Sequence, residues 1–188
     1  MVTIKKTVIQ NIKFPSLQLE KGDWVSLAFP SVFNAPKLLG AYCKHIEASS
    51  EQGIFKSRKV FTWLNLTHTN PFYSRIVPVE QLIKKEKDID NKAILQYAKK
   101  ELEIDVSRNM QSLDATKRVL LLYQLQKKKV DLIVASIAGM EPWGAQQLWD
   151  WFKEEQAEHR VIELCHSIGR VYSIAKESQL VKLEKEED

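Results

Sequence analysis

The second half of the chain alternates between helix and strand patterns, and this alternation limits the folds that are open to it. Apolar residues recur at helical spacing after Asp114, and a predicted buried strand follows at Val130–Ser136, with the apolar run Leu132–Ala135 at its centre. A second helical pattern, Trp143–Glu158, leads into a second predicted buried strand, Arg160–Cys165. Strands that are apolar throughout are typical of parallel sheets whose two faces are both covered by helices. The sequence therefore predicts an α/β fold with a mainly parallel sheet flanked by helices.

The first half of the chain predicts an antiparallel β portion followed by mixed helices and strands. Short stretches of alternating apolar and polar residues fill the opening segment as far as Leu19. The run Trp24–Phe29 is nearly all apolar and predicts a buried strand. Further expected elements are a helix capped by Asn34 with Pro36 in its first turn, a strand at Val60–Leu66, helix over most of Val79–Leu102 with a break near Asp88, and a hairpin of two strands, Arg170–Ala175 and Gln179–Leu183.

Length and composition fit one globular domain. The chain has 188 residues, of which 44% are hydrophobic and 28% charged, so it can bury a core without disulfides or metal. Its two cysteines, Cys43 and Cys165, are too few for a disulfide framework. Neither a membrane span nor a signal peptide is expected, and we expect a cytoplasmic protein.

Charge is distributed unevenly along the chain. Residues 1–94 carry 14 basic and 8 acidic side chains, whereas residues 95–188 carry 14 basic and 16 acidic ones. A basic half could contact phosphates or an anionic membrane surface, but a solvated surface explains the same charge. No basic run is interleaved with aromatic residues, which argues against nucleic-acid binding and leaves it as the third hypothesis.

Several short segments follow one another in a recognisable order. They are Leu19–Leu27, Leu38-Leu39, Val77–Leu82, Arg118–Leu125, Asp131–Val134, Gly139–Pro142 and Val161–His166. In this order they resemble segments of the nucleotide-binding domain of ABC-type ATPases: the strand before the phosphate loop, the leucine pair after it, the entry to the helical subdomain, the helix after the signature motif, the Walker B strand, the D-loop and the strand that ends in the H-loop histidine. The resemblance implies a P-loop NTPase-like fold in one domain over residues 1–188, with a reduced helical subdomain at 79–110 and an acidic tail at 184–188.

The residues at the phosphate-loop positions differ from the pattern of that family. An ATP phosphate loop needs glycines that let backbone N–H groups reach the phosphates, a lysine, and a hydroxyl that binds magnesium. Counted back from the leucine pair, the glycine positions hold Val32 and Asn34, the lysine position holds Ala35 and the hydroxyl position holds Pro36. Lys37 lies close by but out of register. This loop is not expected to bind a triphosphate.

The Walker B and signature positions differ as well. The carboxylate position holds Ser136 and the general-base position holds Ile137. The signature motif aligns with Gln111–Ala115, where Ser112 is retained and both glycines are replaced. Phosphoryl transfer depends on these groups for positioning and for charge stabilisation. We therefore expect no enzymatic activity, no bound cofactor and no metal.

Other polar residues have simpler explanations. His166 stands where the family has a histidine that senses the γ-phosphate, and a local hydrogen bond at the end of a strand is the favoured explanation. Cys165 and His166 are expected on opposite faces of a strand, so they do not predict a shared metal. Glu141 and His166 have no nucleophile or oxyanion site beside them, so they do not predict an acid–base pair.

The tryptophans indicate an interaction surface. Trp149 and Trp151 are two residues apart on one helix, so they cannot both face the same core. Tryptophan is enriched at binding hot spots, and the resemblance places this helix after the D-loop, which lies at the dimer interface of the family. A contact surface and simple core packing explain these residues about equally well. The interface candidates are Ser112, Glu141, Trp143, Trp149, Trp151 and His166.

These observations favour a binding or structural subunit. The leading hypothesis is a catalytically inactive ABC-ATPase-like protein of an ABC-type transport system, cytoplasmic or peripheral to the inner face of the membrane. Its partner would be an active ABC ATPase subunit, a second copy of the chain, or the membrane subunit of a transporter. The alternative is a small-ligand or nucleotide-binding protein that uses the strand-end cleft near Ser136, Ile137 and His166 without ATP hydrolysis.

Overall fold

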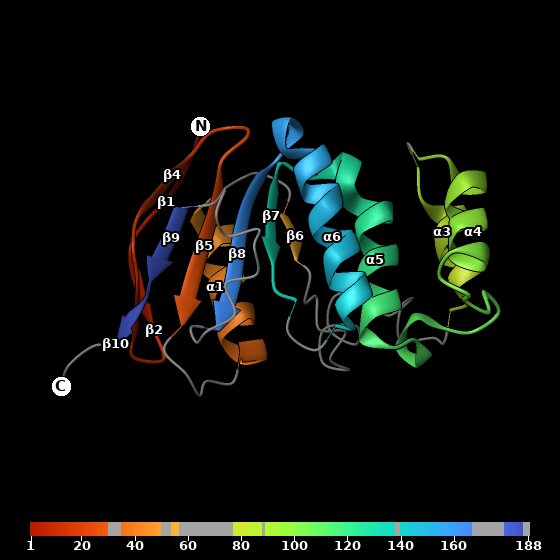
Figure 1. Cartoon of the computed structure of the whole chain (residues 1–188), viewed down its shortest axis with the longest axis horizontal. Helices are drawn as coiled ribbons and strands as arrows, with labels where there is room; N and C mark the ends of the chain where they lie inside the picture. Colours follow the sequence, from red (N-terminus) through yellow and green to blue (C-terminus); the bar gives the residue numbers. More distant parts are fainter. Residues whose placement is uncertain are drawn as a thin grey trace. The chain divides into compact units, whose positions relative to one another are not determined.

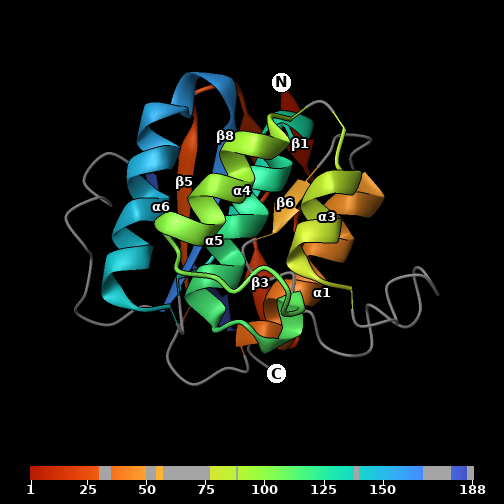
Figure 2. The ribbon, with the colours of Figure 1, turned by 90° about the vertical axis from the view of Figure 1, so that its right-hand side faces the viewer.

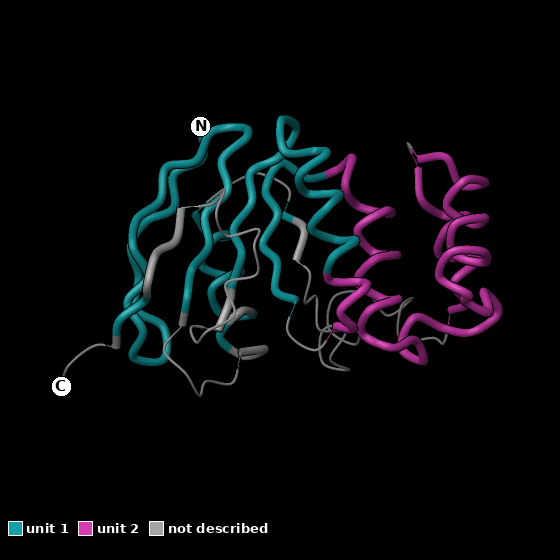
Figure 3. The backbone as a smooth tube through the Cα atoms, in the orientation of Figure 1, with its two compact units in different colours: residues 1–58, 130–138, 146–188 teal, residues 59–129, 139–145 magenta. Residues whose placement is uncertain are grey.

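The computed structural model describes residues 1–29, 35–49, 54–56, 77–87, 89–137, 140–166 and 179–185. The chain divides into two compact units (Figure 3). Unit 1 comprises residues 1–58, 130–138 and 146–188, and unit 2 comprises residues 59–129 and 139–145. The boundary between them falls within one helix, α6 (Pro142–Glu154). The organisation as one functional domain stays a prediction.

A five-stranded parallel sheet is the largest element of unit 1 (Figure 1). Its strand order is β6-β7-β8-β5-β9, and every pair of neighbours runs parallel. The register places Trp24 opposite Val161 and Ala135 opposite Glu163. The predicted parallel sheet is thus confirmed. Its strands are β5 (Trp24–Phe29), β6 (Ile54–Lys56), β7 (Leu132–Ala135), β8 (Arg160–His166) and β9 (Gln179–Lys182).

Two small antiparallel sheets complete unit 1 and match the expected β portion. The first pairs β1 with β4, and the second pairs β3 with both β2 and β10. Strands β1, β3 and β4 each bury their first and third residues and expose the second, as the alternating sequence predicts. The strands are β1 (Val2–Ile4), β2 (Thr7–Ile9), β3 (Ile12–Phe14), β4 (Leu17–Leu19) and β10 (Glu184–Lys185).

One face of the parallel sheet contributes to a core shared with helix α1 (Ala35–Ser49). Val25 and Leu27 of β5 belong to the same buried cluster as Tyr42 and Ile46 of α1. The ring of Tyr42 also stacks on Phe14 of β3, with ring centroids 4.2 Å apart. Successive strand residues point to opposite faces, so Trp24 and Ser26 face away from this core.

The opposite face of the sheet is covered by the part of α6 that belongs to unit 1. The ring of Trp24 lies 5.3 Å from that of Trp149 and 6.3 Å from that of Phe152. Trp149 is 2% exposed and Phe152 is 1% exposed. These aromatic contacts hold the unit 1 part of α6 on β5, and they place Trp149 in the core of unit 1.

Unit 2 is helical within the residues that the structure describes. Helices α3 (Val79–Lys85) and α4 (Asn91–Lys100) lie next to each other (Figure 1, Figure 2). Their separation confirms the predicted break near Asp88, a position that is itself outside the described residues. A short 3-10 helix, η1 (Met110–Ser112), precedes α5 (Ala115–Gln126). Asp114 caps α5 as predicted, because its carboxylate accepts a hydrogen bond from the backbone N–H of Lys117 at 2.8 Å.

The structure differs from the sequence prediction at two places in the second half of the chain, the pairing of its last long strand and the end of helix α6. Residues Gln179–Lys182 form β9, which pairs in parallel with β5 and places Gln179 opposite Val25, a pairing that the sequence did not predict. The helix predicted to continue to Glu158 ends at Glu154 and is followed by a 3-10 turn, η3 (Gln156–Glu158). The predicted strands Val60–Leu66 and Arg170–Ala175 and the predicted cap Asn34 lie outside the described residues. Among the helices that the structure describes, none combines the length and the hydropathy needed to cross a bilayer.

Candidate functional site

The carboxyl ends of three parallel strands meet at one edge of the five-stranded sheet. β5 ends at Phe29, opposite His166 at the end of β8. β7 ends at Ala135, opposite Glu163 of β8. Open α/β sheets bind ligands at this kind of edge, because the loops that follow the strands gather there. The structure therefore brings the positions resembling the Walker B and H-loop motifs to one edge of unit 1.

The Walker B-like positions follow a strand that ends at this edge, and the described phosphate-loop positions begin the helix that comes after β5 in the sequence. Ser136 and Ile137 follow directly after β7, where Ser136 is 5% exposed and Ile137 is partly buried. Helix α1 is the next described element after β5 in the sequence, and the N-terminus of a helix carries the partial positive charge that favours anions. Of the phosphate-loop positions, Ala35, Pro36 and Lys37 form the start of α1, whereas Val32 and Asn34 lie outside the described residues.

A carboxyl group lies on the α6 side of the same sheet. The hydroxyl of Ser26 on β5, which is fully buried, donates a hydrogen bond to Oε2 of Glu163 on β8 at 2.7 Å. Burial raises the pKa of the Glu163 carboxyl, and the hydrogen bond from Ser26 opposes this shift in part. Sequence reasoning missed this pair. The signal was a glutamate between the apolar residues Ile162 and Leu164 of β8.

The signature-like segment in unit 2 is held against the start of α5. The backbone N–H of Ser112 donates to Oδ1 of Asn109 at 3.0 Å, and the Ser112 hydroxyl donates to the Asn109 carbonyl oxygen at 2.8 Å. Nη2 of Arg118 donates to the carbonyl oxygen of Leu113 at 2.6 Å and, at 3.4 Å, to that of Gln111. Ser112 is exposed, but its hydroxyl is engaged within its own turn.

The D-loop-like segment is also attached to α5. Glu141 precedes α6, and its carbonyl oxygen accepts hydrogen bonds from the N–H groups of Gly144 and Ala145. Pro142 occupies the first helical position, which suits proline because it has no N–H group to satisfy there. The backbone N–H of Glu141 donates to Oγ1 of Thr116 in α5 at 2.7 Å. This turn therefore has a fixed conformation, held from a residue 25 positions earlier in the sequence.

The three tryptophans of α6 occupy different environments. Trp143 is 48% exposed, Trp151 is partly buried, and Trp149 is 2% exposed in the core of unit 1. As expected from their spacing, Trp149 and Trp151 do not share one environment. Trp143 is the member of the group with a largely exposed side chain, and it lies in unit 2 beside Glu141.

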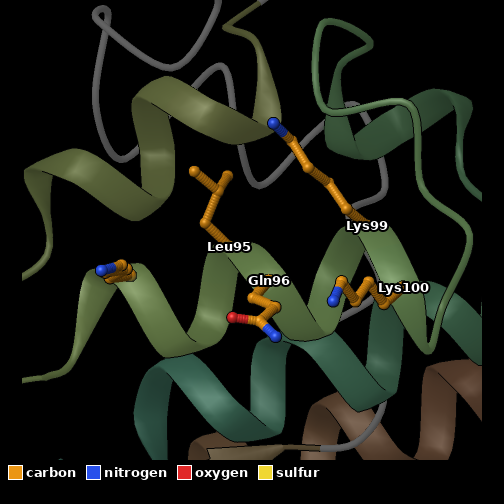
Figure 4. Close-up of a pocket in the computed structure, with 5 residues that line it drawn as sticks. Leu95, Gln96, Lys99 and Lys100 are labelled. Atoms are coloured by element: carbon orange, nitrogen blue, oxygen red, sulfur yellow. The ribbon is translucent and has the colours of Figure 1, made fainter.

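A hollow on α4 has no arrangement suited to a ligand. It encloses about 300 Å³ and is lined by one helix (Figure 4). Lys99 extends away from Lys100 and Gln96, so the polar groups do not converge. Within the described ranges, no group of three or more histidine, cysteine, aspartate or glutamate side chains could hold a metal ion. The residues that line the hollow are Lys92, Leu95, Gln96, Lys99 and Lys100.

Comparison with solved structures identifies the fold. An inward-facing ABC transporter assigned to the metal-chelate type matches 100% of this chain and 82% of its own, with a TM-score of 0.60 and 12% identity. A dimeric bacterial ABC transporter cassette matches 100% of this chain and 97% of its own, with a TM-score of 0.52 and 15% identity. The chain has the fold of ABC-type ATPase cassettes. A bacterial Atm1-family ABC exporter with ATP bound matches 94% of this chain and 34% of its own, with a TM-score of 0.56 and 10% identity. No model of a protein family matches the sequence, and no curated protein matches it.

These matches correct the expectation that the chain is not an enzyme. The solved proteins that share its fold are ABC ATPase cassettes, and ABC ATPases hydrolyse ATP. Nothing in the part of the chain that the structure describes shows that this domain is inactive. The exclusion of enzymatic activity, which rested on residue identities at the motif positions, is therefore wrong.

Proposed function

We propose that the chain is an ABC-ATPase-type subunit that works in an ABC transport system by pairing with a second copy of itself. The observation that carries the proposal is the exposed indole of Trp143 on the fixed turn that begins α6. The dimeric bacterial cassette supports pairing as a property of proteins with this fold. In this role the protein works in the cytoplasm, at the inner face of the membrane.

Trp143 has the properties of an interface anchor. Its side chain is 48% exposed, the largest such fraction among the described large hydrophobic residues apart from Met1. Burying a tryptophan removes a large apolar surface from water at a small cost in side-chain entropy, which is why tryptophan dominates many interfaces. Pro142 and the hydrogen bond from Glu141 to Thr116 fix the backbone beside it, so little order has to be gained on binding.

We further propose that pairing does not require Mg-ATP. The support for this proposal is the set of residues at the motif positions, where Ala35 and Pro36 replace the lysine and the magnesium-binding hydroxyl, and Ser136 replaces the Walker B carboxylate. A pair that forms through side-chain contacts alone is independent of nucleotide. The dimer dissociation constant should therefore be measured both with and without Mg-ATP.

Sedimentation of the full chain over a range of protein concentrations tests the proposal. The native chain should form a dimer with the same dissociation constant in the presence and absence of Mg-ATP. Replacing Trp143 by alanine should raise that constant about thirtyfold or more, since a hot-spot residue contributes about 2 kcal/mol or more. Val8→Ala is the matched control, because Val8 is another exposed apolar residue, 45% exposed, on a different element. A chain that stays monomeric, or a Trp143→Ala variant that pairs like the native chain, would contradict the proposal.

A further inference from the structure

The start of α5 holds two segments that are far apart in the sequence. Thr116 lies in the first turn of this helix and is 1% exposed. Its Oγ1 accepts the hydrogen bond from the N–H of Glu141 at 2.7 Å. The first backbone N–H groups of a helical segment have no partner within the helix, so an outside acceptor such as this hydroxyl determines where α6 begins. Thr116 thus sets the position of the turn before Trp143.

The methyl group of Thr116 has a separate role. It lies so close to Gly144 of α6 that a Cβ atom at residue 144 would be 2.1 Å from Cγ2 of Thr116. Real Cβ atoms do not approach another atom that closely, so glycine is required for the two helices to pack at this distance. The two branches of one side chain therefore fix the first turn of α6, one by a hydrogen bond and the other by contact.

The signature-like segment is fixed to the same end of α5. Asp114 caps the helix, and Arg118 binds the carbonyl oxygens of Leu113 and Gln111 from one turn further along. Ser112 is therefore presented by the helix end that also holds Glu141. Both candidate contact segments of unit 2 depend on the first four residues of one helix.

We propose that Thr116 is a positioning residue, which joins these two segments into one preformed contact surface of Ser112, Glu141 and Trp143. This inference rests on the proposed function, because it explains how the Trp143 contact is prepared. A surface whose parts are fixed before binding loses little conformational freedom on association, so fixation lowers the dissociation constant. Thr116 acts through Glu141 and makes no contact with the partner.

Two substitutions separate the hydroxyl from the rest of the Thr116 side chain. Thr116→Val keeps the volume and both branches but removes the acceptor, so the N–H of Glu141 loses its partner. Thr116→Ser keeps the acceptor. In the valine variant we expect the amide hydrogen of Glu141 to exchange at least about fivefold faster, measured by NMR, and the dimer dissociation constant to rise about five- to tenfold. In the serine variant both values should stay within about twofold of the native ones.

A control distinguishes positioning from loss of stability. Leu125→Ala removes a buried side chain, 5% exposed, from the far end of α5, so it should destabilise the fold. It should leave unchanged the dimer dissociation constant and the ratio of the Glu141 exchange rate to the rate of exchange through global unfolding. Equal exchange of Glu141 in the native and valine chains would overturn the inference. The inference would also be overturned if Thr116→Val paired like the native chain while Trp143→Ala paired weakly. In that case the proposed function would stand. If Trp143→Ala pairs normally, the proposed function fails, and the positioning role in binding fails with it even where the exchange rate changes.

Discussion

The contact between Gly144 and Thr116 allows a quantitative prediction. Gly144→Ala adds a methyl group whose carbon would be 2.1 Å from Cγ2 of Thr116, so either the Thr116 side chain or one of the helices must shift. Overpacking of this kind costs about 1–3 kcal/mol. Alanine also has a higher helix propensity than glycine, which returns about 0.5–1 kcal/mol. We expect a net loss of about 1–2 kcal/mol, or a fall in Tm of about 2–8 °C for a chain of this length.

A double-mutant cycle tests the cause of this loss. Thr116→Ser removes the methyl group that clashes and keeps the hydroxyl that Glu141 needs. The remaining atoms near a Cβ at residue 144 are Cβ of Thr116 at 3.4 Å and Cδ1 of Leu120 at 3.5 Å, which are ordinary contacts. In the serine background Gly144→Ala should therefore be neutral or stabilising by about 0.5–1 kcal/mol.

The assay is urea denaturation of the four chains, followed by circular dichroism. The cycle should give a coupling free energy of about 1–3 kcal/mol between the two positions. The reasoning would be refuted by a Gly144→Ala variant that is as stable as the native chain. It would equally be refuted by losses that add without coupling, since the clash would then not involve Cγ2 of Thr116.

Three further predictions concern other parts of the chain. Asp114→Ala removes the cap of α5 and should lower the free energy of unfolding by about 0.5–2 kcal/mol, whereas Asp114→Asn should recover most of the loss in the same urea titration. The raised pKa of Glu163 means that the native chain loses stability as the pH rises from the ordinary pKa of a glutamate to the higher pKa of the folded state. Glu163→Gln should remove this loss, so its stability relative to the native chain should increase across that pH range, and parallel pH profiles would contradict the assignment. Trp149→Ala should cost about 3–5 kcal/mol in thermal or urea unfolding, whereas Trp143→Ala should cost the monomer less than about 0.5 kcal/mol.

Patterns that repeat along the chain predicted most of the fold. The apolar periodicity of α5 and α6 and the apolar runs of β7 and β8 identified these elements, because a helix or strand that faces a core needs apolar residues at its own period. The capping role of Asp114 followed from its place before an apolar helical pattern. These features depend on residues that are close in sequence.

Features that depend on distant residues were not predicted. The pattern of β9 indicates a strand but does not say which strand it pairs with, and its pairing with β5, more than 150 residues earlier in the sequence, left no sign in either segment. The bond between Thr116 and Glu141 joins two segments whose separate sequences give no sign of it. Gly144 did leave a signal, since a glycine inside a helical pattern lowers helix propensity and so has a packing reason. The exclusion of enzymatic activity was wrong, because it considered only the residues at the motif positions, whereas the solved proteins that share this fold are ABC ATPase cassettes.

The position of β9 has a consequence for how the protein is made. This strand pairs with β5, so Gln179 lies opposite Val25, and the backbone N–H of Leu183 donates to the carbonyl oxygen of Ala28 at 2.8 Å. During synthesis β5 leaves the ribosome long before β9. Until β9 emerges, the edge of β5 that β9 covers has no strand beside it. The sheet is completed once residues 179–185 have emerged, so folding of unit 1 finishes after almost all of this sequence has been translated. A nascent chain arrested before this point exposes an unpaired β5 edge, which is a surface that chaperones protect and that other chains can pair with.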